Sequence, residues 1–195
     1  PNDKILATSV GAKDIIKNTK VYETLEPAVQ RVDCLIATTS RFRNKNIKHI
    51  KLDDLNKIDF RKKIAFLFGS EASGLSNNEI SYANYTMQIP SNPEFKSLNL
   101  SHSVIIIAQI VSTLIKLNSS KYKKSNKVKS ASKKDVQSML NLCVKNLEKR
   151  NFFKPKEKKP IMLENLRSIF YKMELSQKET RILSSVFANL AKKVD

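Results

Sequence analysis

Two glycines and one acid stand close together directly after a short apolar run, in a pattern that could bind a ligand. The run ends at Gly69, and Glu71 is the only charged residue before Gly74. Because glycine lets backbone approach a ligand closely, this loop is a candidate site. The two glycines have the spacing of a phosphate-binding P-loop, but leucine and serine follow here in place of lysine and serine or threonine. The sequence therefore excludes a P-loop triphosphatase.

A second cluster of small polar residues lies in residues 90–99, between an apolar run and an apolar helical pattern. Pro90 and Pro93 restrict this loop, and Ser97 and Asn99 stand where the helix begins. Serine and asparagine are also favoured helix caps, which is the structural alternative. Both clusters follow predicted strands, and open α/β sheets bind ligands at the carboxyl ends of their strands. We therefore expect the two loops to form one site.

Other chemistries have little support in the sequence. No Ser-His-Asp or Cys-His arrangement is readable, so hydrolysis is not indicated. Cys34 and Cys143 are far apart in apolar patterns typical of core residues, and His49 and His102 are the only histidines. We therefore expect neither a disulfide framework nor a metal site.

Short apolar strands alternate with helical patterns around the two loops. The expected strands are residues 33–37, 64–68 and 85–89, and the expected helices are 4–10, 25–32 and 100–117. Ser76 and Glu79 form a capping box for a further helix. Residues 47–62 are polar, with a weak helical pattern around residues 52–58. This alternation predicts an α/β domain with a mainly parallel sheet.

The composition changes after residue 117. Residues 119–134 are dominated by Ser, Lys and Asn, which predicts a flexible basic linker. Helices are expected at 136–149, 163–172 and 177–193. Ser132 with Asp135 resembles a capping box for the first of them, and Ser176 with Glu179 forms one for the last. The last helix has an apolar stripe that is typical of core packing: Ile182, Leu183, Val186, Phe187 and Leu190. The expected organisation is thus residues 1–118, a linker 119–134 and a helical extension 135–195.

The net charge points to a polyanionic partner. The chain has 36 basic and 18 acidic residues, a formal charge of +18. A lysine-rich solubilising surface is the simpler explanation, but such an excess is typical of proteins that bind nucleic acid. No signal peptide is visible, and the longest uninterrupted apolar run, residues 104–107, is too short to cross a bilayer. We expect a cytoplasmic protein.

Together the two clusters resemble motifs two and three of the SPOUT-class RNA methyltransferases, in the TrmH-like tRNA/rRNA 2′-O-methyltransferase family. The first reads Phe-Gly-x-Glu-x-x-Gly-Leu-Ser-Asn-x-Glu at 68–79, and the second Ile-x-x-Asn-Pro-x-x-x-Ser-Leu-Asn-Leu at 89–100. The second is most similar to the TrmJ group of tRNA cytidine/uridine-2′-O-methyltransferases. Residues 38–43 resemble that group's arginine-bearing loop, and residues 147–190 its helical extension. The resemblance covers nearly the whole chain.

The resemblance implies a trefoil-knotted α/β domain that methylates ribose in tRNA, in the anticodon loop, with S-adenosyl-L-methionine as donor and no metal. It also implies a homodimer with residues 100–117 at the interface. The implied cofactor residues are Thr38, Thr39, Ser40, Gly69, Ile89, Lys96, Ser97 and Leu98. The implied catalytic residues are Glu71, Ser97 and Asn99, and the implied RNA contacts are Arg41 and Arg43. An rRNA methyltransferase and a non-catalytic RNA-binding module of the same fold remain alternatives.

One family feature has no match in this sequence. Motif one, with its asparagine and arginine, would lie on a strand–helix–strand unit of about 30 residues ahead of residues 2–17. We therefore expect an N-terminally incomplete domain, which keeps the cofactor pocket but is weak in catalysis.

Overall fold

The central element of the protein is a sheet of four parallel strands, in the order β2-β4-β1-β3. The computed structural model describes residues 3–40, 47–92, 94, 98–118 and 129–190. The strands are β1 (Cys34–Thr38), β2 (Lys48–Lys51), β3 (Ile64–Leu67) and β4 (Tyr85–Gln88). Three of them were predicted, and the parallel arrangement is confirmed.

Strand β2 was missed by sequence reasoning. It lies at the edge of the sheet and pairs only with β4 among the described strands. Three of its four residues are exposed, and Ile50 alone is buried. An edge strand with one inward side chain has no apolar run to reveal it. The predicted weak helix is the short 3₁₀ helix η2 (Leu52–Lys57), which follows directly.

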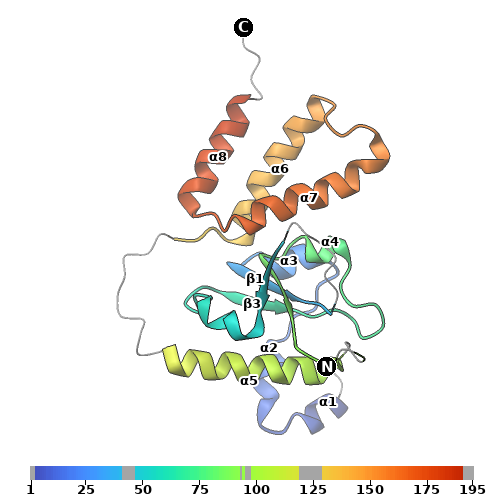
Figure 1. Ribbon diagram of the computed structural model, residues 1–195, viewed down its shortest axis with the longest axis vertical. Helices are drawn as coiled ribbons and strands as arrows, with labels where there is room; N and C mark the ends of the chain where they lie inside the picture. The colour runs from blue at the N-terminus through green and yellow to red at the C-terminus, as the bar shows by residue number, and fades with distance from the viewer. Residues whose placement is uncertain (1–2, 41–46, 93, 95–97, 119–128, 191–195) are drawn as a thin grey trace.

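Strand β1 divides the core between the two faces of the sheet. Its side chains alternate, so that Cys34 and Ile36 belong to one cluster of buried residues and Leu35 to another. The first cluster is covered by helix α5 (Leu100–Asn118), which contributes the buried Ile107. In Figure 1 this helix runs beneath the sheet, opposite the helices at the top.

The opposite face carries α3 (Leu25–Val29) and three C-terminal helices, α6 (Lys133–Lys149), α7 (Lys159–Lys172) and α8 (Gln177–Leu190). Leu35 of the sheet shares one hydrophobic cluster with Val136, Met139, Tyr171 and Leu175 of the C-terminal segment. The extension is thus built on the same core as the sheet.

Polar contacts also join the sheet to the C-terminal helices at their shared interface, which we call the seam. The Asn84 side chain accepts a hydrogen bond from the Leu35 N–H at 2.9 Å and donates to the Tyr171 carbonyl at 2.8 Å. The Lys133 ammonium donates to the Tyr82 carbonyl at 2.6 Å and lies 3.8 Å from the centre of the Tyr171 ring. A cation over an aromatic face is attracted by the ring quadrupole, which supports the burial of this lysine.

The predicted linker extends too far at its C-terminal end. Lys133 begins α6 and is 3% exposed, and Ala131 is 5% exposed within the shared core. The Lys133 N–H also donates to the Val32 carbonyl at 2.9 Å. Composition misled here because the neighbouring lysines suggested solvation, whereas Lys133 finds a carbonyl and an aromatic ring in the seam. Residues 119–128 lie outside the described residues.

Three capping boxes begin helices where the sequence predicted them. Ser76 caps the single-turn helix α4 (Asn77–Ile80), and Ser132 caps α6. Ser176 accepts a hydrogen bond from the Glu179 N–H at 3.2 Å, and its own N–H donates to the Glu179 carboxylate at 2.7 Å. These reciprocal bonds satisfy backbone donors at each helix start.

The apolar stripe of α8 is only half buried, so the core-packing prediction is wrong for part of it. Leu183 and Phe187 pack against the shared core, but Ile182, Val186 and Leu190 are 52%, 44% and 65% exposed. Helix α8 packs mainly against α6 and lies at the side of a three-helix layer, so one edge of its stripe faces outward.

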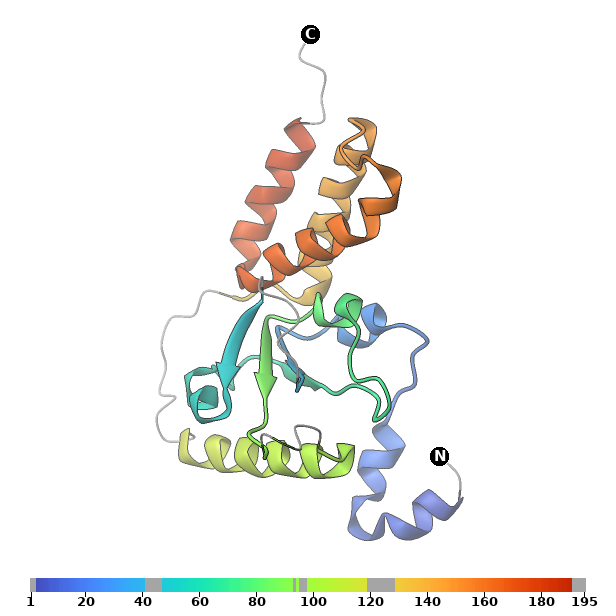
Figure 2. The same ribbon diagram turned by 45° about the vertical axis from the view of Figure 1, so that its right-hand side comes forward.

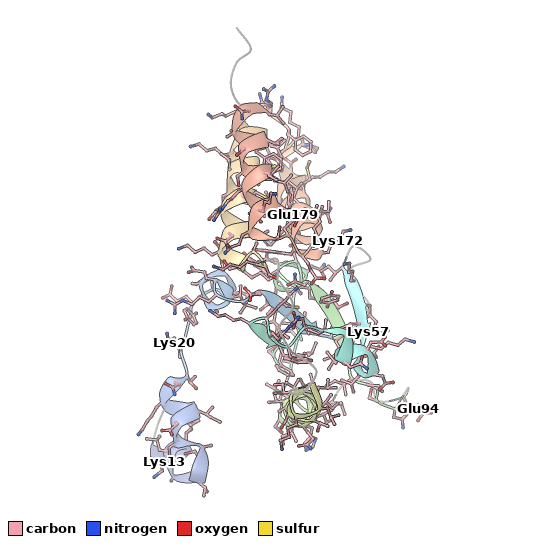
Figure 3. The ribbon with its side chains drawn as sticks, turned by 90° about the vertical axis from the view of Figure 1, so that its left-hand side faces the viewer. Lys13, Lys20, Lys57, Glu94, Lys172 and Glu179 are labelled. Carbon is pink, nitrogen blue, oxygen red and sulfur yellow. The ribbon has the colours of Figure 1, made fainter. Side chains whose placement is uncertain are left out.

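The N-terminal segment forms an arm that extends from the body of the protein (Figure 2). It contains α1 (Asp3–Thr8), the 3₁₀ turn η1 (Val10–Ala12) and α2 (Lys13–Asn18). Val10 and Ile15 are exposed along it. Figure 3 shows Lys13 and Lys20 on this arm, away from Lys172 on the helical layer.

Candidate functional site

Three loops meet at the carboxyl ends of β3, β1 and β4 and enclose a pocket of about 410 Å³. Residues 38–40 lie at the end of β1, and residues 68–75 follow β3. The remaining lining residues lie at or beyond the end of β4, at positions 88–89, 98–100 and 103. The two sequence clusters therefore lie in one site, as expected. The structure brings together eight of the predicted site residues: Thr38, Thr39, Ser40, Gly69, Glu71, Ile89, Leu98 and Asn99.

Four other predicted site residues cannot be placed. Arg41, Arg43, Lys96 and Ser97 lie outside the described residues. Their roles in RNA binding, cofactor binding and catalysis stay predictions from the resemblance.

The β1 loop is fixed by hydrogen bonds to both neighbouring strands. The Thr38 hydroxyl donates to the Leu67 carbonyl at 3.0 Å, and the Thr39 N–H donates to the Met87 carbonyl at 2.9 Å. These bonds tie the end of β1 to β3 on one side and to β4 on the other. The end of β1, which lines the pocket, is therefore held in place by one side-chain and one backbone hydrogen bond.

The glycine loop folds back on itself. The Gly74 N–H donates to the Ser70 carbonyl at 2.9 Å, and these two residues form an antiparallel bridge. A Cβ on Gly69 would lie 2.2 Å from the Gly74 carbonyl carbon, so Gly69 is required by a close approach within the loop. Gly74 adopts φ +67°, a left-handed conformation that glycine accepts without strain. The two glycines thus shape the loop that forms the pocket wall.

Glu71 joins the glycine loop to the start of helix α5. Its carboxylate accepts a hydrogen bond from the Leu100 N–H at 3.3 Å, in the first turn of the helix. A negative charge at this position also interacts favourably with the helix dipole. Glu71 therefore has a structural reason to be acidic, besides the catalytic role that the resemblance implies.

Asn99 serves as a helix cap, which was the structural alternative considered for it. Its side-chain oxygen accepts from the Ser101 N–H at 2.9 Å and from the Ser101 hydroxyl at 2.7 Å. Its carbonyl accepts from the Ser103 N–H at 3.0 Å. The cap orients the first turn of α5 toward the pocket, so that Leu98, Leu100 and Ser103 reach the lining.

The electrostatics of the pocket are simple. Glu71 is the only charged side chain among the described lining residues, and most of the others present hydroxyl, amide or backbone groups. Among these described lining residues, a polyphosphate would meet one negative charge and no cation, whereas a neutral or cationic nucleoside would meet neither repulsion nor a large desolvation cost. The described residues contain no cluster of three or more His, Cys, Asp or Glu side chains that could hold a metal ion.

Sequence reasoning missed part of the lining. Ser70, Ser73 and Gln88 line the pocket, and so does Ser103. Ser103 could have been found, because it lies four residues after Asn99 and thus on the same helical face. Gln88 is the last residue of β4 and directly precedes Ile89. Nothing in its residue type would have identified it as a lining residue.

Comparison with known proteins gives the same family as the motifs. The profile of the SpoU rRNA methylase family matches residues 1–109. A Haemophilus influenzae protein described as an uncharacterized tRNA/rRNA methyltransferase is 25% identical over 209 residues, covering 100% of this chain and 80% of that protein. The Sulfolobus acidocaldarius tRNA (cytidine-2′-O-)-methyltransferase TrmJ is 38% identical over 109 residues, covering 54% of this chain and 46% of the relative.

The fold has the same relatives. The crystal structure of TrmJ from Z. mobilis ZM4 superimposes with a TM-score of 0.84 at 26% identity, covering 98% of this chain and 82% of that one. This likeness confirms the SPOUT α/β fold with a helical C-terminal part. With the family profile covering more than half of its residues, the chain belongs to the SpoU rRNA methylase family.

Proposed function

We propose that this protein transfers a methyl group from S-adenosyl-L-methionine to the 2′-hydroxyl of a ribose in tRNA. The observation that carries the proposal is the pocket at the carboxyl ends of β3, β1 and β4, whose described lining residues are neutral except for Glu71. Its volume, about 410 Å³, lies within the range of pockets that bind small molecules and cofactors. The names of the TrmJ relatives favour tRNA ribose as the substrate.

The proposed donor fits the chemistry of the lining. It carries an adenosine, which hydroxyl and backbone groups can hold, and a positive sulfonium, which one carboxylate favours. Residues 38–40, Gly69, Ile89 and Leu98 would hold the adenosine part, largely through backbone. The donor supplies a methyl group on a neutral thioether leaving group, so no developing anion has to be stabilised on that side.

What remains for the protein is to position the ribose and to ease loss of its 2′-hydroxyl proton. The 2′-oxygen forms the new bond to the methyl carbon as the carbon–sulfur bond breaks, and the hydroxyl proton leaves to a base or to solvent. Glu71, Ser97 and Asn99 are the residues proposed to act on this side. Arg41 and Arg43 are proposed to contact RNA phosphates.

The helical extension is proposed as a second RNA contact. Residues 1–118 would carry the donor site, and residues 135–195 would bind the body of the tRNA through phosphate contacts, in line with the charge of +18. Because the extension shares a core with the sheet, it would present its lysines in a fixed orientation.

A homodimer is proposed from the outer face of α5. The residues that pack on the sheet include Ile107 and Leu114, but Val104, Ile105 and Ile115 are 42%, 64% and 50% exposed. In the part of the chain that the structure describes, α5 is also the one helix whose length and composition would allow it to cross a membrane. A second copy packed on this face would bury these side chains, as expected for a cytoplasmic member of this class.

Titration calorimetry with S-adenosyl-L-methionine tests the donor site, with S-adenosylhomocysteine as competitor. Methyl transfer from labelled donor to tRNA and, in a separate reaction, to rRNA identifies the substrate, and mass spectrometry of the digested RNA locates the 2′-O-methyl group. Transfer to rRNA alone would favour the rRNA alternative. Donor and RNA binding without transfer would favour the non-catalytic module. Absence of donor binding would contradict the proposal.

A further inference from the structure

The single-turn helix α4 connects the pocket wall with the helical extension. Leu75 ends the glycine loop, lines the pocket, and is 5% exposed in a cluster with Ile80 and Ala83. The capping box of Ser76 follows at once. The position of the pocket wall therefore depends on where α4 is held. A helix of one turn is not stable alone, so its position must come from tertiary contacts.

Arg167 of α7 supplies such contacts at the far end of α4. Its guanidinium donates to the Asn78 side-chain oxygen at 2.7 Å and to the Ser81 hydroxyl at 2.9 Å. Its central carbon lies 4.1 Å from the centre of the Tyr82 ring. Ser81 is fully buried and in turn donates to the Asn78 carbonyl at 2.6 Å. Figures 1 and 2 both show α7 lying directly over α4.

The residue type matters for this arrangement. The planar guanidinium makes two hydrogen bonds through one nitrogen while its face stacks on an aromatic ring, which a lysine ammonium cannot reproduce. The capping box fixes the start of α4 and Arg167 fixes its end. Together, the capping box and the Arg167 contacts hold helix α4 and the glycine loop before it in one position.

We propose that Arg167 is a positioning residue for the donor pocket: it holds α4 and, through Leu75, the glycine loop that forms the pocket wall. This inference rests on the proposed function only for the identity of the ligand. The helical extension would then serve the chemistry as well as RNA binding, because displacement of α7 would loosen the pocket.

Hydrogen exchange of the ligand-free protein tests the positioning without any ligand. The amides to follow are those of Gly74, Ile80 and Ser81, which donate to the carbonyls of Ser70, Ser76 and Asn77. In Arg167→Ala we expect their exchange to speed up about tenfold or more, and in Arg167→Lys by less.

Glu174→Gln is the matched control for loosening of the seam in general. Glu174 also joins the extension to the sheet, but its partners are Tyr85, Lys62 and Lys48 rather than α4. This variant should leave exchange in residues 74–81 within about twofold of the unmodified protein. Equal acceleration in both variants, or none in Arg167→Ala, would overturn the inference.

Titration with S-adenosyl-L-methionine on the same proteins extends the test to the ligand. We expect the dissociation constant to rise about fivefold to tenfold in Arg167→Ala and to stay unchanged in Glu174→Gln. If the unmodified protein binds no donor, the proposed function fails, while the exchange data still decide the positioning role. If exchange rises but donor affinity does not, the link from α4 to the pocket is wrong.

Discussion

Replacing Gly69 with alanine tests whether the fold-back of the glycine loop builds the pocket. The new Cβ would lie 2.2 Å from the Gly74 carbonyl carbon and 2.4 Å from the Leu75 nitrogen, where ordinary van der Waals contact is 3.4–4 Å. Both neighbours are backbone atoms, so no change of rotamer relieves the overlap. The loop would have to open by more than 1 Å (3.4 minus 2.2) to accept one methyl group.

The chain offers matched controls, because its three glycines differ in surroundings. Overpacking of a tight site costs about 1–3 kcal/mol, and the backbone overlap at Gly69 places this variant at the upper end. Gly74→Ala meets nothing within 4 Å but keeps φ +67°, which costs about 1–2 kcal/mol. Gly11→Ala meets nothing and has no positive φ, so it should be neutral or stabilise by up to about 1 kcal/mol.

Urea unfolding and donor calorimetry on the three variants give the readouts. We expect Gly69→Ala to lose the most stability and to weaken donor binding at least about tenfold, with Gly74→Ala between it and Gly11→Ala. Opening of the loop removes the pocket wall, so affinity should fall even under conditions in which the variant is fully folded. Gly69→Ala with the stability and affinity of Gly11→Ala would refute the reasoning.

Three further predictions concern the seam and α5. Burial lowers the pKa of Lys133 from 10.5 to about 7. Between pH 7 and 9 the unfolded chain therefore binds more protons than the folded chain, and the free energy of unfolding should rise with pH by up to about 1.4 kcal/mol per pH unit. Urea unfolding at several pH values measures this slope, which should be flatter in Lys133→Met. Asn84→Ala leaves the Leu35 N–H without its partner and removes one hydrogen bond from the Tyr171 carbonyl, which still accepts from the Glu174 N–H at 3.3 Å. The same assay should show a loss of about 2–4 kcal/mol, and a loss below about 1 kcal/mol would contradict the seam geometry. Ile105→Glu, at a side chain 64% exposed, should shift sedimentation from dimer to monomer without changing the circular dichroism spectrum, and an unchanged dimer would contradict the proposed interface.

The window for the Lys133 prediction has a physical limit. Burial also raises the pKa of Cys34 from 9.0 to about 11. Above pH 9 the unfolded chain therefore loses the thiol proton that the folded chain keeps, and stability falls as pH rises. The two effects oppose each other above pH 9, so the slope is read below it.

Local signals in the sequence predicted much of the site. Gly69 and Gly74 marked the loop, Pro90 marked the end of β4, and the serine–acid pairs marked three helix starts, because each of these depends on neighbouring residues alone. The union of two loops into one pocket also followed, since parallel strands end at the same edge.

Features set by distant partners could not be predicted in this way. Lys133 reads as a solvated lysine until Tyr82 and Tyr171 are placed around it. Glu71 pairs with Leu100 only once the two loops meet. Arg167 has no local pattern at all, because its partners lie more than 80 residues earlier in the chain.

Hydrogen exchange with and without saturating S-adenosyl-L-methionine tests the central claim most directly. If the pocket at the strand ends is the donor site, protection should concentrate in residues 38–40, 69–75 and 98–103 and leave the outer helix α8 unchanged. Binding without protection in these three loops, or protection confined to the helical extension, would contradict the account.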